Sequence, residues 1–335
     1  MTGNNPADRL DLIDDHRLRT PVARLAHDRI NLYAKLEYSN RSGSTKDRSA
    51  YWILRRAVER GELGPHSTVV ESSSGNFAIS LASYCRALGV PFVPVIDENV
   101  NPPTEGFLRR LCAHVEKVGD LDETGGYLAT RLARVQHLRA ELDDVYWPDQ
   151  YSNPDAADAH FRFTAEEVRA TFGRLDYLFV GVGTGATVAG LSTRLKQVYP
   201  HLRVIAVDAE GSAIFGGPPR RRHIPGLGSS LIPPLLTDAL IDEVLIVPEV
   251  EAVAGCHRLL HRHGLYAGGS TGSVYFAIER YFDDYVGPAP TVLFLCADRG
   301  TAYAETVYEP AWIVATFGPD AVPDDSSRPL LRRSA

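Results

Sequence analysis

Residues 42–49, with the sequence SGSTKDRS, place one lysine, Lys46, in a polar segment. Lysine and arginine together number 35, yet only four of these residues are lysines: Lys35, Lys46, Lys117 and Lys196. A primary amine forms an imine with a carbonyl compound, which a guanidinium does not do. In a chain so rich in arginine, Lys46 is therefore a candidate for covalent chemistry. A solvated surface charge is the ordinary alternative for a lysine in such a segment.

A serine-rich segment, residues 71–76 (ESSSGN), follows an apolar run and precedes a helical pattern. Small hydroxyl residues and glycine at such a junction expose backbone N–H groups at the positive end of a helix, which favours an anion. We expect a carboxylate to bind there and Asn76 to reach a ring hydroxyl. A cluster of helix caps is the alternative, because serine and asparagine favour caps for local reasons. The candidate anion ligands are Ser72, Ser73, Ser74 and Gly75.

A glycine-rich segment, residues 181–187 (GVGTGAT), joins a predicted strand to a predicted helix. Glycines let the backbone close on a phosphate and threonines add hydroxyl groups, so a small phosphate monoester is the favoured ligand. The dinucleotide pattern G-x-G-x-x-G is incomplete, although alanine is tolerated at its last position and Asp208 follows the next strand, where a ribose-binding acid would lie. The Walker pattern is absent, and a purely structural turn is the other alternative. The candidate phosphate ligands are Gly183, Thr184, Gly185, Ala186 and Thr187.

A third small-residue loop, residues 268–273 (GGSTGS), is expected before another helix. The Ser270 hydroxyl is a candidate hydrogen-bond partner for a ring nitrogen. As an isolated pattern the segment is equally typical of a helix cap.

The elements that must position these loops follow from hydrophobic patterning. Short apolar and β-branched runs alternate with segments of helical spacing, which predicts a mainly parallel sheet covered on both faces. Ligands of such folds bind at the carboxyl ends of strands, where loops lead into helices. The predicted strands are 67–71, 90–96, 114–118, 144–147, 177–182, 203–207, 243–247 and 291–295. The predicted helices are 50–62, 76–88, 128–142, 156–172, 188–198, 250–263 and 274–282.

Composition narrows the class of protein. The 335 residues suffice for a large core, and a hydrophobic content of 44% is typical of a globular protein. A net charge of −7 argues against a nucleic acid or an anionic membrane as partner. The polar start predicts neither a signal nor a transit peptide, and no apolar run has the length of a membrane span. Cys85, Cys112, Cys256 and Cys296 lack C-x-x-C spacing, which indicates reduced thiols in a cytoplasm and no metal site.

Lys46, Asn76, residues 183–187 and Ser270 together resemble the motifs of the fold-type II pyridoxal-phosphate enzymes, the cysteine synthase and cystathionine β-synthase group. The resemblance extends over nearly the whole chain, from Thr20 to Gly300. It implies pyridoxal 5'-phosphate as the cofactor and Lys46 as its Schiff-base lysine. It further implies that Asn76 contacts the ring oxygen, that residues 183–187 hold the phosphate and that Ser270 bonds the pyridine nitrogen. Ser73 and Ser74, with the neighbouring backbone, would hold the substrate carboxylate.

The resemblance also implies the fold class and the domains. We expect an α/β protein of the tryptophan synthase β type, with two three-layer α/β/α domains and the cofactor between them. Residues 1–40 and 150–317 would form the large cofactor-binding domain, and residues 41–149 the small substrate-binding domain. The segment 318–335, rich in Pro, Asp, Ser and Arg, is expected to be a disordered tail.

Four further segments are similar to the N-(2-amino-2-carboxyethyl)-L-glutamate synthases. They are residues 125–131 (GGYLATR), 150–154 (QYSNP), 211–216 (GSAIFG) and 224–230 (IPGLGSS). That family joins O-phospho-L-serine to L-glutamate with release of phosphate, on the way to 2,3-diaminopropionate for siderophores and peptide antibiotics. The resemblance implies an enzyme of this kind, a homodimer, and an NAD-dependent dehydrogenase that cleaves the product as its pathway partner.

The chemistry implied by the resemblance assigns further roles. Lys46 would act as general base at the α-carbon, with a pKa that burial must lower. A neutral serine at the ring nitrogen favours loss of the β-substituent over transamination. Arg131 is the candidate for the phosphoserine phosphate, because a guanidinium binds phosphate bidentately, and Tyr151 is expected to line the same pocket. The basic run 220–223 (RRRH) is a candidate for glutamate, with a solvated charged face as its alternative.

Several alternatives stay open at this point. The nearest is a cysteine synthase that uses O-acetylserine or O-phosphoserine with sulfide, but such enzymes usually carry TSGNT where residues 73–77 read SSGNF. A serine or threonine dehydratase would need no second substrate. A cofactor-binding regulator would show no turnover. A nicotinamide enzyme is kept because of Asp208.

Overall fold

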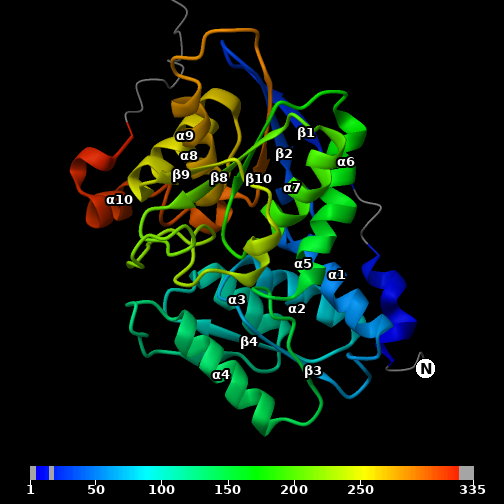
Figure 1. The fold of residues 1–335 in the computed structure, drawn as a ribbon. Coiled ribbons are helices and arrows are strands. Elements are labelled where there is room, and N and C mark those ends of the chain that lie inside the picture. The colour runs from blue at the N-terminus through cyan, green and yellow to red at the C-terminus, as the bar shows by residue number, and fades with distance from the viewer. Residues whose placement is uncertain (1–4, 15–18, 324–335) are drawn as a thin grey trace, which may run out of the picture.

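The computed structural model describes residues 5–14 and 19–323 of the chain. Its strands form two separate sheets, one above the other in Figure 1. All neighbouring strands in both sheets are parallel, with the single exception of the pair β1 and β2. The larger sheet has the order β1 (Val22–Leu25), β2 (Asn31–Leu36), β10 (Thr291–Cys296), β7 (Tyr177–Gly181), β8 (Arg203–Ala209), β9 (Glu243–Val247). The smaller sheet has the order β5 (Glu116–Val118), β4 (Phe92–Asp97), β3 (Thr68–Ser72), β6 (Val145–Tyr146).

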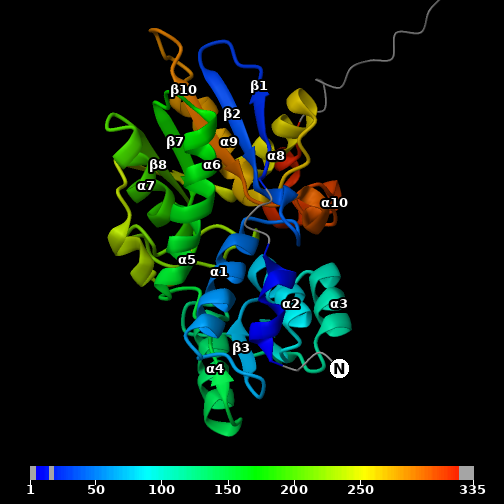
Figure 2. The same ribbon diagram turned by 90° about the vertical axis from the view of Figure 1, so that its right-hand side faces the viewer.

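Helices cover both faces of each sheet. On the larger sheet, α8 (Glu249–His263) and α9 (Gly269–Tyr281) pack on one face. The opposite face carries α6 (Ala165–Thr171) and α7 (Ala186–Val198), as Figure 2 shows. The smaller sheet lies between one helix, α4 (Leu128–Glu141), and a group of three on the other side. This group is α1 (Lys46–Glu59), α2 (Asn76–Leu88) and α3 (Pro102–Leu111).

The remaining helices connect the two sheets and their covering helices. A continuous helical segment links α5 (Pro154–Ala159) through a π-helix, η4 (His160–Thr164), to α6. The 3-10 helices are η1 (Pro6–Ile13), η3 (Glu37–Ser39), η5 (Pro234–Asp238) and η6 (Gly300–Tyr303), and α10 (Pro310–Phe317) follows them. The tail predicted over 318–335 begins with a short 3-10 helix, η7 (Pro319–Ala321), and its residues 324–335 lie outside the described residues.

The predicted strands all exist, with shifts of a few residues at their ends. Three helix predictions are corrected in detail. Helix α1 begins at Lys46 and not at residue 50, and the helix predicted over 156–172 is interrupted by the π-helix. Residues 269–273, predicted as a loop, form the start of α9. The pattern missed β1, β2, α3 and α10.

A buried cluster of charges fixes the start of α1 against the larger sheet. Lys35 of β2 and Arg48 of α1 both contact Glu167 of α6, at 2.5 and 2.6 Å. Arg48 also lies 3.2 Å from Glu37. Burial alone would raise the pKa of Glu37, but Arg48 and Lys35 hold it at about 2. Because charges buried in this way need their partners, the cluster holds the turn that carries Lys46 in one place.

The cysteines and the lengths of the helices bear on two of the predictions made from composition. All four cysteines are free thiols. Across the part of the chain that the structure describes, no helix is both long and apolar enough to cross a membrane.

Candidate active site

Lys46, Asn76, the glycine-rich loop and Ser270 meet in one pocket, whereas residues 72–75, Arg131, Tyr151 and Ala186 are not among the residues that line it. Lys46 and Asn76 line it from the N-termini of α1 and α2, and residues 180–185 line it from the carboxyl end of β7. Ser270 closes it from α9. Parallel strands present their carboxyl ends at one edge of a sheet, so the convergence of these loops follows from the topology.

Lys46 is the first residue of α1, and Thr45 precedes it as the N-cap. The Thr45 N–H donates to the Ala297 carbonyl at 2.8 Å, which anchors the segment to the end of β10. Burial lowers the pKa of Lys46 to about 8, although the Asp298 carboxyl opposes this shift. An amine with such a pKa is partly neutral near pH 8 and is therefore a competent nucleophile and base.

The glycine-rich loop ends at a helix N-terminus. Gly185 has a φ of +85°, which favours glycine, and α7 begins at the next residue, Ala186. The N–H groups of the first helical turn have no partner within the helix, so they present donors to an anion. Thr187 Oγ1 lies 3.2 Å from His160 Nε2. Burial lowers the pKa of His160 to about 3, so this imidazole is neutral.

Ser270 lies in the first turn of α9 and is buried. A Cβ at Gly226 would lie 3.9 Å from Ser270 Oγ, so the loop after β8 comes close to this hydroxyl.

The hydroxyl groups of the serine-rich loop differ in their hydrogen bonds: that of Ser73 caps a helix, and that of Ser72 has no partner in the part of the chain that the structure describes. Ser73 Oγ accepts hydrogen bonds from the N–H groups of Gly75 and Ala78, at 3.4 and 3.2 Å, and so acts as a cap. Ser72 Oγ is buried and has no hydrogen-bond partner among the described residues, and the same holds for Thr45 Oγ1. Because buried polar atoms are normally paired, these two hydroxyls have unused capacity to bind a ligand.

Arg131 is bound by neighbours on the smaller sheet. Its Nη1 donates to Ser74 Oγ at 2.9 Å, and its Nε lies 3.2 Å from Asp97 Oδ2. Ser74 in turn donates to Asp97 at 2.7 Å. Asp97 therefore balances part of the guanidinium charge. Tyr151 is half-buried, and its pKa is raised by burial and lowered by the nearby Arg131.

Asp298 is a pocket residue that the sequence reasoning missed. Its carboxylate accepts hydrogen bonds from Asn76 Nδ2 at 2.7 Å and from the Tyr303 hydroxyl at 2.8 Å. Its other oxygen, Oδ1, is buried and has no hydrogen-bond partner among the described residues. A signal was present in the sequence, since Asp298 lies three residues after the predicted strand 291–295, at the strand end where ligands bind.

Asp208, which suggested a nicotinamide enzyme, does not line this pocket. It is fully buried, and its Oδ1 accepts a hydrogen bond from the Ala209 N–H at 2.8 Å.

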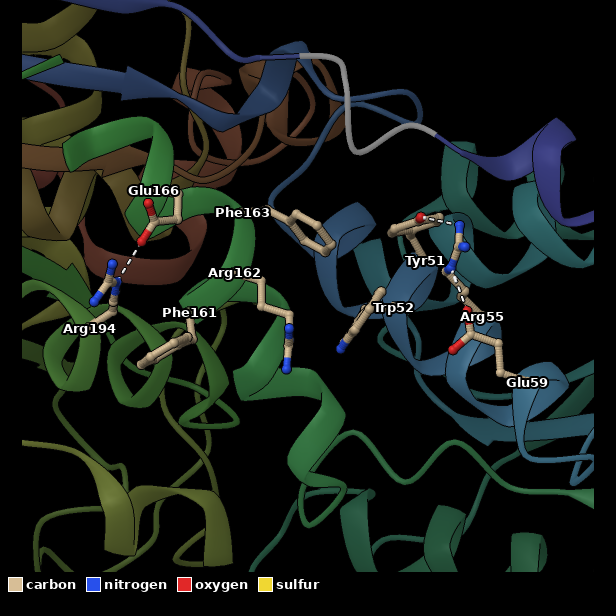
Figure 3. A pocket seen from close by; sticks show the side chains of 9 residues that line it. All are labelled: Tyr51, Trp52, Arg55, Glu59, Phe161, Arg162, Phe163, Glu166 and Arg194. Carbon is tan, nitrogen blue, oxygen red and sulfur yellow. Dashed lines mark hydrogen bonds and ion pairs between the residues drawn. The ribbon is translucent and has the colours of Figure 1, made fainter. Parts of the chain in front are cut away.

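A larger hollow of about 710 Å³ lies elsewhere, between α1 and the segment formed by η4 and α6 (Figure 3). It contains none of the residues singled out in the sequence. Two of its ion pairs, Arg55 with Glu59 at 2.8 Å and Arg194 with Glu166 at 2.5 Å, are internal to the lining. The chemistry of the chain is therefore assigned to the pocket around Lys46. The residues that line the larger hollow, and not the pocket around Lys46, are Tyr51, Trp52, Arg55, Glu59, Phe161, Arg162, Phe163, Glu166 and Arg194.

The pocket fits pyridoxal phosphate. It offers an amine of lowered pKa at Lys46, a helix N-terminus after a glycine loop, and a buried oxygen at Thr45 that has no partner among the described residues. Fold and site together define an enzyme of the fold-type II pyridoxal-phosphate class. The family model described as pyridoxal-phosphate dependent enzyme matches residues 13–298, and the chain belongs to this family.

Two curated relatives carry the name N-(2-amino-2-carboxyethyl)-L-glutamate synthase. The protein of Cupriavidus metallidurans is 42% identical over 303 residues, which cover 90% of this chain and 89% of the relative. The protein of Ralstonia nicotianae is 41% identical over 299 residues and 88% of each chain. The family resemblance found in the sequence is thereby confirmed.

Solved structures agree on the fold. An O-acetylserine dependent cystathionine beta-synthase from Helicobacter pylori superposes with a TM-score of 0.81 at 28% identity, over 88% of this chain and 97% of that one. A hydrogen sulfide-producing enzyme from Fusobacterium nucleatum gives a TM-score of 0.80 at 26% identity, over 88% of this chain and 98% of that one. The predicted fold class and the predicted cofactor are confirmed by these similarities.

Proposed function

We propose that this enzyme catalyses a β-replacement that joins O-phospho-L-serine to L-glutamate, giving N-(2-amino-2-carboxyethyl)-L-glutamate and phosphate. The observation that carries the proposal is the similarity to two synthases of this name over about nine-tenths of the chain, combined with the pocket around Lys46. When bound, pyridoxal phosphate withdraws electrons from the α-carbon of an amino acid, which permits loss of a β-substituent.

Within this proposal the Lys46 amine performs the proton transfers. Its lowered pKa makes neutral Nζ available to take the α-proton and later to return it. Asn76 carries two amide protons, of which one is used by Asp298, so the other is free for the ring oxygen. Ser270 holds the ring nitrogen without supplying a charge. Asp298 keeps the Asn76 amide in position.

The anionic groups have separate binding positions. The start of α7, residues 183–187, holds the cofactor phosphate with backbone N–H groups and threonine hydroxyls. The serine-rich loop, residues 72–75, holds the substrate carboxylate, for which Ser72 Oγ is unpaired. Arg131 binds the phosphate of phosphoserine with the part of its guanidinium that Asp97 leaves unused. Tyr151 lines the same space.

Further expectations belong to the same proposal. Residues 1–40 and 150–317 act as the large domain and residues 41–149 as the small one, which agrees with the strands of the two sheets, while η1 packs on α1 and α2 of the small one. The enzyme works as a homodimer in a reducing cytoplasm, which suits its free cysteines. Its product is cleaved by an NAD-dependent dehydrogenase to 2,3-diaminopropionate for a siderophore or a peptide antibiotic.

A competition experiment tests the reaction. Purified enzyme with pyridoxal phosphate is incubated with phosphoserine, glutamate and sulfide in equal concentrations, and the products are weighed by mass spectrometry while phosphate release is measured. We expect the glutamate adduct and stoichiometric phosphate. Cysteine as the main product would identify a cysteine synthase, and pyruvate with ammonia a dehydratase. Either outcome would reject the proposal.

A further inference from the structure

Only one arginine of the basic run 220–223 turns toward the protein interior. Arg220 and Arg221 are exposed, and Arg220 lies 3.7 Å from Glu210 at the surface. Arg222 is half-buried, and its Nη1 donates to the Gly211 carbonyl at 2.6 Å. Arg220 and Arg221 therefore form a solvated charged face, as the alternative interpretation of the run predicts, whereas Arg222 does not belong to that face.

The Arg222 guanidinium has no carboxylate partner of its own. It forms no ion pair within 4 Å with any described residue, unlike most of the arginines that the structure describes, and two acids, Asp208 and Glu249, act on it from a greater distance. Glu249 is occupied by the backbone N–H groups of His223 and Ile224. Asp208 Oδ1 accepts from the Ala209 N–H, while its buried Oδ2 has no hydrogen-bond partner among the described residues and gives Arg222 a charge nearby without an ion pair. A guanidinium that is partly withdrawn from water and has no ion pair favours an anion.

The surroundings of Arg222 place it beside the active site. It packs against Gly228, where a Cβ would lie 3.1 Å from Arg222 Nε. Gly228 belongs to a loop that passes close to Ser270 at Gly226. At its other end the same loop reaches the segment between β5 and α4, where a Cβ at Gly126 would lie 3.7 Å from Ser230 Oγ. Figure 1 shows the chain after β8 between the two sheets.

Tyr151 connects Arg222 with the candidate phosphate site. Burial raises the pKa of Tyr151, while the charges of Arg131 and Arg222 both lower it, so both guanidiniums act electrostatically on one hydroxyl. Arg131 is partly balanced by Asp97, and Arg222 has no ion pair with a described residue. Two cations therefore act on Tyr151, one from α4 and one from the loop after β8. This arrangement suits two anionic substrates.

We propose that Arg222 binds a carboxylate of the second substrate and makes the enzyme select an anionic amine donor. The inference rests on the proposed function, because it assigns the receptor for glutamate within that reaction. Arg131 would serve the first substrate and Arg222 the second. The preference for glutamate would then come from a charge in the loop after β8 and not from the cofactor pocket.

Steady-state kinetics of Arg222→Ala test the inference, with Arg221→Ala as the matched control on the same run. At saturating phosphoserine we expect the KM for glutamate to rise about 10- to 100-fold in Arg222→Ala, the range for a lost hydrogen bond to a charged group. The KM for phosphoserine and the cofactor absorbance should stay within about twofold of the wild-type values, as all parameters should in Arg221→Ala. An unchanged KM for glutamate, or an equal rise for both substrates, would overturn the inference.

Glutamine as donor distinguishes the two carboxylates of glutamate. If Arg222 binds the side-chain carboxylate, wild type prefers glutamate over glutamine and Arg222→Ala loses this preference. If both donors weaken equally in the variant, Arg222 does not set the preference for glutamate, and the inference is overturned.

Arg222→Gln decides the question if the alanine variant does not bind cofactor. It removes the charge but keeps a long polar side chain, so a rise in KM confined to glutamate supports the inference, whereas an unchanged KM rejects it. A wild-type enzyme that makes no adduct from phosphoserine and glutamate would reject the proposed function itself. Adduct formation with an unchanged variant would reject only the role of Arg222.

Discussion

The side-chain amide of Asn76 donates a 2.7 Å hydrogen bond to the carboxylate of Asp298. Asn76 begins α2, which packs on the smaller sheet, while Asp298 follows β10 of the larger one. Among the residues that the structure describes, Asp298 is also the one charged group that shifts the pKa of the Lys46 amine. One carboxylate thus connects the two sheets, orients Asn76 and influences Lys46.

Replacing Asp298 by Asn should lower the pKa of Lys46 further. Burial already lowers this pKa to about 8, and the Asp298 charge opposes the shift, so its removal leaves burial unopposed. The rate at which apoenzyme recovers cofactor absorbance rises as the amine loses its proton. Its pH midpoint should therefore move from about 8 to a lower pH in the variant. Tyr303→Phe keeps the charge and should keep the midpoint, and equal midpoints in all three proteins would contradict the role of Asp298.

Replacing Lys46 by Ala should abolish the absorbance of the bound cofactor and reduce turnover by at least about 100-fold, the lower end for loss of a general base. The fold should survive, because the amine makes no hydrogen bond or ion pair with the described residues and its burial opposes its charged form. The melting temperature is the control measurement. Lys117→Ala, which removes a surface lysine paired with Glu105, should leave turnover unchanged. Retained turnover in Lys46→Ala would refute the assigned role.

The sequence predicted the strands well because buried parallel strands are continuous apolar runs. Strand β2 was missed because the buried Lys35 interrupts such a run. Its partner Glu167 lies 132 residues further along the chain, so no local pattern reveals that this charge is paired. Asp298 was missed for the same reason, since its partner Asn76 is 222 residues away.

The start of α9 was predicted as a loop because glycine and serine are poor helix formers. Tertiary packing overrides this preference. Helices α8 and α9 approach so closely that a Cβ at Gly272 would lie 2.3 Å from Cys256 Sγ. The glycines in this segment therefore serve helix packing, which a single sequence does not distinguish from a loop.

Replacing Arg131 by Ala should impair the use of phosphoserine more than that of O-acetylserine. A phosphate gains a charge-assisted hydrogen bond from the guanidinium, so kcat/KM for phosphoserine should fall about 10- to 100-fold while that for the uncharged substrate changes little. Arg134→Ala is the matched control, because Arg134 lies on the same helix and pairs with Glu116 at 3.0 Å. Equal losses with both substrates would reject the phosphate assignment and leave Arg131 as the partner of Asp97.

Glu71 should make stability depend on pH. It is fully buried, and burial raises its pKa to about 8, against hydrogen bonds from the Ser72 and Gln150 N–H groups. The folded state thus binds a proton that the unfolded state releases near pH 4.5. The resulting stabilisation is fully present below pH 4.5 and is lost as the pH rises through about 8. The free energy of unfolding of wild type, relative to Glu71→Gln, should fall by about 3 kcal/mol between pH 5 and pH 8, at 1.36 kcal/mol per pKa unit. Urea denaturation of both proteins across this range measures the difference, and a difference that does not vary with pH would show that Glu71 is ionised throughout.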